Sequence, residues 1–146
     1  MSLTRKFVVL GGAGTIGRVV VRDLFTSHRA NRILIADYNA AAARAQARRY
    51  RSPRVSAGFA AAQRTAALVR LLRGHAVVIN CTQHDFNLDV MRAALRARVH
   101  YLDLGGLFHW TRRQLRLHRA FERAGLTADD GQTVGDRKST RLNSSH

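Results

Sequence analysis

The stretch "FVVLGGAGTIGRVV", residues 7–20, decides the fold of this 146-residue chain. It begins as an apolar run of β-forming residues, which predicts a strand over 5–10. Four glycines then fall within seven positions, and apolar residues return at helical spacing over 15–27. The stretch therefore predicts a strand, a tight turn and a helix in direct succession. On the inner face of this helix we expect Ile16, Val20 and Leu24.

The alternation of strand and helix continues along the chain. Further strands are predicted at 32–37, 53–58, 75–80 and 99–104, and further helices at 40–50, 63–73, 87–98 and 111–124. Asp85 is placed to cap the helix that begins at residue 87. Because alternating strands and helices with short connections require parallel pairing, the predicted fold class is α/β: a Rossmann-like, doubly wound parallel sheet.

Gly12, Gly14 and Gly17 form the G-x-G-x-x-G pattern of dinucleotide-binding loops. The first glycine permits a tight turn, the second lets the backbone approach a pyrophosphate, and the third lets the helix pack closely on the strand. Thr15 and Ile16 open the helix, so their backbone N–H groups are offered to the phosphates. We therefore predict that these five residues bind a dinucleotide.

Asp37 stands at the end of the second predicted strand, where such folds contact the adenosine ribose. A carboxylate at this place accepts hydrogen bonds from the ribose hydroxyls and repels a 2′-phosphate. Tyr38 and Asn39 add no cation that would compensate for that repulsion. The sequence therefore predicts NAD as the cofactor in preference to NADP.

Gly11 gives the loop a second interpretation, because Gly11, Gly14 and Gly17 also form G-x-x-G-x-x-G. Short-chain dehydrogenases and nucleotide-sugar epimerases use that spacing, together with a Tyr-x-x-x-Lys pair for proton transfer. Neither Lys6 nor Lys138 follows a tyrosine at that distance. The loop alone leaves a short-chain-dehydrogenase or epimerase-like domain as an alternative.

A downstream segment separates these alternatives. Asn80-Cys81-Thr82 at a strand end and "HYLDLGGLFH" at 100–109 resemble the saccharopine dehydrogenase family, in particular its branch of lysine 6-dehydrogenase-like enzymes. The resemblance covers residues 5–128. It implies an N-terminal Rossmann domain that binds a nicotinamide dinucleotide, a substrate domain after it, and hydride exchange at the CH–NH or CH–NH2 group of an amino acid.

The strand ends in this segment supply the remaining cofactor-binding candidates. In doubly wound sheets, ligands lie beyond the carboxyl ends of the strands. We therefore expect the nicotinamide half of the cofactor to lie against Asn80, Cys81, Thr82 and Gly105. We interpret Cys81 as a small buried side chain without a reactive role.

Two residues are candidates for catalysis. His109 follows the glycines in the loop where substrate is expected, and an imidazole can take a proton from an amine near neutral pH. Asp103 is the second candidate, with hydrogen bonds that order the loop as its alternative role. The other histidines show no metal-ligand spacing, so no metal is predicted.

The family pattern is lost at Asp129. We expect an incomplete dinucleotide-binding domain over 1–128, cut before its last strands, and a disordered, non-native tail over 129–146, with the substrate domain missing. Residues 136–146, "DRKSTRLNSSH", resemble the translation of a sequencing-adapter oligonucleotide. On this interpretation the chain is the cofactor-binding fragment of an oxidoreductase and is inactive alone.

The formal net charge of +16 raises nucleic acid as a partner. The basic residues are almost all arginines and are scattered over nearly every predicted helix, so we interpret them as a solvated surface and expect no nucleic-acid partner. A nucleic-acid-binding module and a non-catalytic NAD sensor remain the alternatives of other classes. The first is supported by an arginine stripe on the last predicted helix, formed by Arg112, Arg116, Arg119 and Arg123.

The remaining features of the composition concern location and partners. The single cysteine rules out a disulfide framework within the chain, and no apolar run approaches the roughly 20 residues that cross a bilayer. We expect a cytoplasmic protein without a membrane partner, whose full-length form binds a small amino-acid substrate and forms a homodimer.

Overall fold

The computed structural model describes residues 4–104 and 111–129. Its strands are β1 (Arg5–Leu10), β2 (Asn31–Asp37), β3 (Val55–Phe59), β4 (Val77–Asn80), β5 (His100–Asp103) and β6 (Ala128–Asp129). Its helices are α1 (Thr15–Ser27), α2 (Ala40–Arg48), α3 (Thr65–Leu72), α4 (Asn87–Ala97) and α5 (Thr111–Arg123), with a 3-10 turn, η1 (His84–Phe86), before α4. Every predicted strand and helix is present, with ends that differ by at most two residues.

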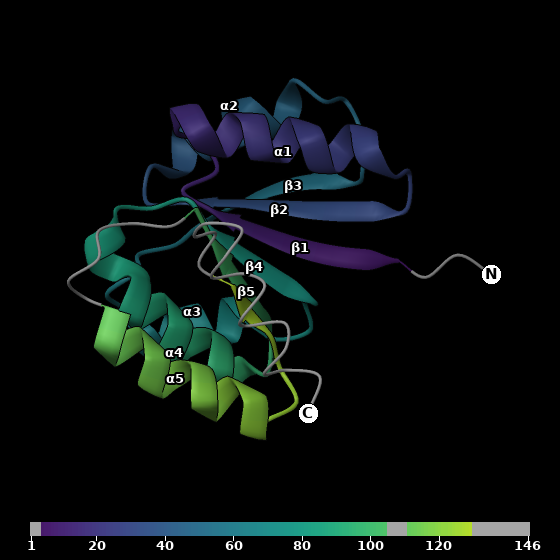
Figure 1. The fold of residues 1–146 in the computed structure, drawn as a ribbon. Helices are drawn as coiled ribbons and strands as arrows, with labels where there is room; N and C mark the ends of the chain where they lie inside the picture. Colours follow the sequence, from purple (N-terminus) through teal and green to yellow (C-terminus); the bar gives the residue numbers. More distant parts are fainter. Residues whose placement is uncertain (1–3, 105–110, 130–146) are drawn as a thin grey trace.

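The strands form one sheet in the order β3-β2-β1-β4-β5-β6, and all neighbouring pairs are parallel. The chain therefore adds strands on one side of β1, returns across the sheet, and adds the others on the opposite side. Helices cover both faces, α1 and α2 on one and α3, α4 and α5 on the other (Figure 1). The doubly wound α/β prediction is confirmed, and the topological switch point lies between β1 and β4.

β6 was not predicted from the sequence. Ala128 and Asp129 pair with Tyr101 and Leu102 of β5, so Asp129 belongs to the sheet instead of the tail that was expected to begin there. A pair of residues is too short to show the alternating pattern by which strands are recognised. The rest of the predicted tail, 130–146, lies outside the described residues.

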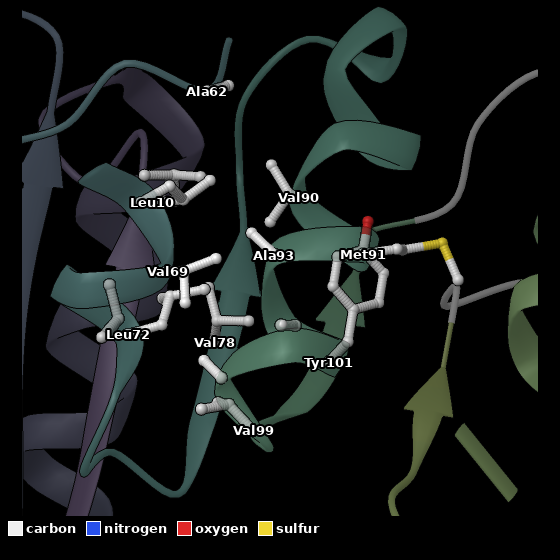
Figure 2. Close-up of a cluster of buried hydrophobic side chains, with 14 of the residues drawn as sticks. Leu10, Ala62, Val69, Leu72, Val78, Val90, Met91, Ala93, Val99 and Tyr101 are labelled. Carbon is white, nitrogen blue, oxygen red and sulfur yellow. The ribbon is translucent and has the colours of Figure 1, made fainter. Parts of the chain in front are cut away.

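Alternate side chains of the strands supply two hydrophobic cores, one on each face of the sheet. Under α1 and α2, Val9 packs with Val21 and Ile35. The core on the other face is larger, and Figure 2 shows how residues from the sheet and from two helices meet in it. Its members there include Leu10 and Val78 of the sheet, Val69 and Leu72 of α3, and Val90 of α4.

The inner face of α1 differs from the prediction. Gly17 and Val21 are its buried residues, whereas Ile16 is 56% exposed, and Val20 and Leu24 are only half-buried. The apolar spacing predicted an inner face containing Ile16. The helix instead lies closest to the sheet at Gly17, which has no side chain, so its inner face contains Gly17 and Val21.

The predicted cap of α4 was also wrong. The N-cap residue is Phe86, which makes no side-chain capping hydrogen bond, and Asp85 lies one residue earlier in η1. The 3-10 turn displaces the helix start relative to the acidic residue, so the carboxylate is not in the capping position.

Arg54 joins the carboxyl end of α1 to the start of β2. Its guanidinium donates hydrogen bonds to the carbonyl oxygens of Phe25 (3.3 Å), His28 (3.2 Å) and Asn31 (3.1 Å). It also lies 3.9 Å from the centroid of the Phe25 ring, a cation–π contact. A side chain from just before β3 therefore satisfies carbonyls at the end of α1 and the start of β2.

Among the described residues, no helix combines the length and the apolar character that crossing a bilayer requires.

Candidate functional site

A groove with a volume of about 530 Å³ lies across the carboxyl ends of β1, β2 and β4, at the switch point of the sheet. Its walls come from the glycine turn, the end of β2, the β3–α3 connection and the segment after β4. The lining residues are Leu10, Gly11, Gly14, Asp37, Tyr38, Ala60, Ala62, Gln63, Cys81, Thr82, Gln83 and Phe86. The place and size are typical of a small-molecule site in this fold.

Three glycines of the stretch 11–17, two in the turn and one in α1, are required by packing within the chain. A Cβ on Gly17 would lie 2.6 Å from the Cα of Gly12, and one on Gly12 would lie 2.9 Å from Cγ2 of Ile35. Gly11 has a φ of +76°, and a Cβ there would lie 2.9 Å from the carbonyl carbon of Cys81. The turn is therefore pressed against α1, β2 and the segment after β4 with no room for side chains.

Gly14 is different. A Cβ on Gly14 would meet the carbonyl oxygen of Gly11 at 3.4 Å and no other atom of the described residues within 4 Å. Its backbone, with φ −77° and ψ 175°, suits any residue. Because the fold does not need a glycine here and the residue lines the groove, the missing side chain keeps space for a group from outside the chain. The sequence predicts a pyrophosphate at this place, and that role of Gly14 stays a prediction.

The start of α1 offers hydrogen-bond donors to the same space. Gly14 is the N-cap residue and supplies no side-chain capping bond, and the first turn of α1 contains no acidic residue. The first N–H groups of a helix have no partner within the helix and carry a partial positive charge. Thr15 and Ile16 begin this turn, as the sequence predicted, and their role in binding an anion stays a prediction.

Asp37 braces the glycine turn and also lines the groove. Its Oδ2 accepts a hydrogen bond from the N–H of Ala13 at 3.1 Å, and its Oδ1 accepts one from the N–H of Asn39 at 2.9 Å. Each carboxylate oxygen has a second lone pair, which leaves Asp37 capable of accepting ribose hydroxyls.

A buried polar network joins the ends of β4 and β5. The Nδ2 of Asn80 donates to Oδ1 of Asn87 (2.8 Å) and to the hydroxyl oxygen of Tyr101 (3.2 Å). The Oδ1 of Asn80 accepts from the N–H of Thr82 (3.1 Å) and from its hydroxyl (2.6 Å). The Tyr101 hydroxyl donates to Oδ2 of Asp103 at 2.5 Å. This network fixes the segment after β4 that forms one wall of the groove.

The structure separates the predicted site residues by position. Those that line the groove are Gly14, Asp37, Cys81 and Thr82. Thr15 and Ile16 stand at the start of α1, and those buried behind the groove are Gly12, Gly17, Asn80 and Asp103. Asn80 and Asp103 are therefore placed to position the wall, while their predicted cofactor-binding and catalytic roles stay predictions. Gly105 and His109 lie outside the described residues.

Sequence reasoning missed the wall formed by the β3–α3 connection, which contributes Ala60, Ala62 and Gln63. The N–H of Ala60 donates to the carbonyl oxygen of Asp37 at 3.0 Å, which brings this connection beside the end of β2. Alanines carry no motif, so the only available signal was their position after a predicted strand. Gln83 and Phe86 also line the groove, and they too belong to no motif that the sequence shows.

Burial, with a smaller effect of the Asp103 carboxylate, raises the pKa of the Cys81 thiol from 9.0 to about 11. The thiol therefore stays protonated and weakly nucleophilic at neutral pH, which supports the interpretation of Cys81 as unreactive. Within 4–104 and 111–129, no three side chains of His, Cys, Asp or Glu gather as a metal site.

Alanine at Gly17 and at Gly14 should have different effects on stability. We expect Gly17→Ala to lower the free energy of unfolding by about 3 kcal/mol or more, because its Cβ overlaps backbone atoms of the turn. Gly14→Ala should lower it by less than about 1 kcal/mol, because its Cβ is accommodated. Urea unfolding followed by circular dichroism measures both, and equal losses would contradict the distinction.

The raised pKa of Cys81 should appear in its alkylation rate. Because the thiolate is the reactive form, we expect the rate with iodoacetamide to keep rising to about pH 11 in the folded chain. Asp103→Asn removes the carboxylate that disfavours the thiolate, so it should move the midpoint to lower pH. Mass spectrometry of the modified chain gives the profile. A plateau near pH 9 in the unsubstituted chain would contradict the raised pKa of Cys81.

Comparison with known proteins gives a match over most of the chain. A family model described as "Saccharopine dehydrogenase NADP binding domain" matches residues 7–128. Apo saccharopine dehydrogenase (L-Glu forming) from Saccharomyces cerevisiae superimposes with a TM-score of 0.74 at 21% identity, over 86% of this chain and 26% of the yeast chain.

Two other solved structures show how widely this fold is shared. Triphenylmethane reductase from Citrobacter sp., complexed with NADP(H), gives a TM-score of 0.63 at 18% identity, over 82% of this chain and 46% of the reductase. dTDP-glucose 4,6-dehydratase from Bacillus anthracis, in complex with NAD, gives 0.56 at 18% identity, over 71% and 40%. At these identities the likeness concerns the fold, and the chain spans less than half of each of these proteins.

Proposed function

This chain belongs to the saccharopine dehydrogenase NADP-binding domain family, and we propose that its groove is where a nicotinamide dinucleotide binds. The family assignment makes it an NAD(P)-binding domain of a saccharopine dehydrogenase-type oxidoreductase. It supports the saccharopine dehydrogenase interpretation over the short-chain-dehydrogenase or epimerase-like alternative that the loop alone left open. The proposal concerns the residues that hold the cofactor and the reaction that the cofactor serves.

The observation that carries the proposal is the space at Gly14. The three other glycines of the stretch 11–17 are explained by contacts within the chain, whereas Gly14 borders the groove beside the open first turn of α1. Gly14, Thr15 and Ile16 would hold the pyrophosphate through backbone N–H groups. Asp37 would accept the adenosine ribose hydroxyls, and the wall at Cys81 and Thr82 would border the nicotinamide half. When bound, the cofactor supplies the hydride chemistry.

We propose further that NAD is preferred over NADP. The family description names NADP and a compared reductase holds NADP(H), so the preference rests on the charge of Asp37 alone. A 2′-phosphate beside this carboxylate would place like charges together. Arg18 is the nearby cation that argues against a preference for NAD. Its Nε donates to the carbonyl oxygen of Ala13 at 3.1 Å, and the N–H of Ala13 in turn donates to Asp37.

Dissociation constants of both cofactors test the site and the preference together. We expect NAD to bind about tenfold more tightly than NADP, equivalent to about 1.4 kcal/mol, and Asp37→Asn to narrow that ratio. Gly14→Ala should weaken both cofactors by about tenfold, because its Cβ occupies the phosphate space while the fold persists. Isothermal titration calorimetry supplies the constants. Unchanged binding in Gly14→Ala would refute the site, and tighter NADP binding would refute the preference and indicate Arg18 as the partner of the phosphate.

We propose, from the resemblance to the saccharopine dehydrogenase family, that the reaction takes place at the CH–NH or CH–NH2 group of an amino acid. Since the chain spans 26% of the yeast enzyme, we predict that the 146-residue chain binds cofactor without turnover. Absorbance at the NADH band, with lysine or saccharopine as substrate, measures this. Turnover by the 146-residue chain would contradict this prediction. A cytoplasmic location and a homodimer of the full-length protein stay predictions.

A further inference from the structure

A second hollow, of about 330 Å³, lies between α1 and α2. These helices run side by side on one face of the sheet (Figure 1). The hollow is lined by Arg18, Val19 and Arg22 of α1 and by Gln46, Arg49 and Tyr50 from the second half of α2 and the residues after it. It shares no lining residue with the groove at the carboxyl ends of the strands. It is therefore a separate feature of the surface, which the proposed function leaves unused.

The α1–α2 hollow is strongly positive. Three of its six lining residues are arginines and none is acidic. The acidic residue of α1, Asp23, is not part of the lining, and α2 contains no acidic residue. Within the described residues, the guanidinium groups of Arg22 and Arg49 have no hydrogen bond or ion pair, and that of Arg18 uses its Nε for Ala13. Most of the N–H donors of the three arginines are therefore available to a ligand.

Gln46 adds an uncharged polar group at the same place. The residue as a whole is only 7% exposed, and its side-chain amide makes no hydrogen bond within the described residues. Its amide atoms are not enclosed by the protein, so they face the hollow that the residue lines. The amide is therefore a further donor and acceptor open to a ligand there.

We propose that the α1–α2 hollow is a second binding site, for a small molecule that carries at least two oxyanion groups. A planar guanidinium binds two oxygens of a phosphoryl or carboxylate group in parallel, and Arg22 and Arg49 present such groups from two helices. The amide of Gln46 binds a further oxygen. Val19, which is 50% exposed, and Tyr50 give the hollow an apolar side, where the uncharged part of the ligand lies.

The site is tested with pyrophosphate and citrate as probes for the two oxyanion chemistries. Each is titrated into the full 146-residue chain, and NMR follows the backbone and the arginine Nε–Hε resonances. We expect saturable shifts centred on Arg22, Gln46 and Arg49 with at least one probe. The double substitution Arg22→Gln/Arg49→Gln should weaken that binding by about tenfold or more, and Gln46→Leu should weaken it less. The stronger probe identifies the ligand as a phosphoryl or a carboxylate compound.

The matched control is Arg70→Gln/Arg96→Gln, which removes the same charge from exposed positions on α3 and α4, over the opposite face of the sheet. It should leave the affinity unchanged within about twofold. Equal weakening by both double variants would overturn the proposal, because it would show a general effect of charge. So would binding of an oligonucleotide without saturable binding of either probe.

Competition separates this inference from the proposed function. Because pyrophosphate would also occupy the phosphate site proposed at Gly14, the competition is followed at Arg22, Gln46 and Arg49. Saturating NAD should leave the probe-induced shifts of these three residues unchanged, because the two sites share no lining residue. Loss of those shifts on addition of NAD would overturn the second site. Loss of NAD binding in Gly14→Ala with intact probe binding would support both assignments.

Discussion

The close contact of α1 with the glycine turn is the constraint on which the rest of the structure depends. Gly17 lies against the backbone of Gly11 and Gly12, where a single added carbon would overlap main-chain atoms. With no side chain between them, α1 starts directly beyond β1, and its first N–H groups border the groove at the switch point. The same contact rotates the helix so that Val21 faces the sheet and Val19 and Arg22 face α2. Gly17 therefore determines which side of α1 faces the sheet and which side faces the α1–α2 hollow.

The wall of the groove opposite the glycine turn depends on hydrogen bonds instead of close packing. Asn80 and Tyr101 are almost completely buried, and the network that they form ends at the segment containing Cys81 and Thr82. A buried amide or carboxylate tolerates few geometries, because each unmade hydrogen bond is unfavourable. The backbone of this wall is consequently held from behind, while Cys81 and Thr82 line the groove in front.

The sequence predicted the elements well because each apolar run has one clear periodicity and is bounded by glycine, asparagine or a polar cluster. It predicted the inner face of α1 wrongly, since the spacing of Ile16 and Val20 could not show that backbone contact at Gly17 sets the approach. β6 was missed because Ala128 and Asp129 gain their strand geometry from pairing with β5. The alanines of the β3–α3 wall and the burial of Gln46 depend on neighbours distant in the chain, which no local pattern contains.

Because of Arg54, one end of α1 is held by the chain itself, whereas the other end has hydrogen-bond donors open to a ligand. Its hydrogen bonds to Phe25, His28 and Asn31 anchor the far end of α1 entirely within the chain. The near end of α1, at the groove, presents donors that only a visiting molecule or water can satisfy. At the proposed cofactor site, release of the ligand would exchange its hydrogen bonds at this end of the helix for bonds to water, while the other end stays anchored. The helix would then take up and release its ligand without refolding.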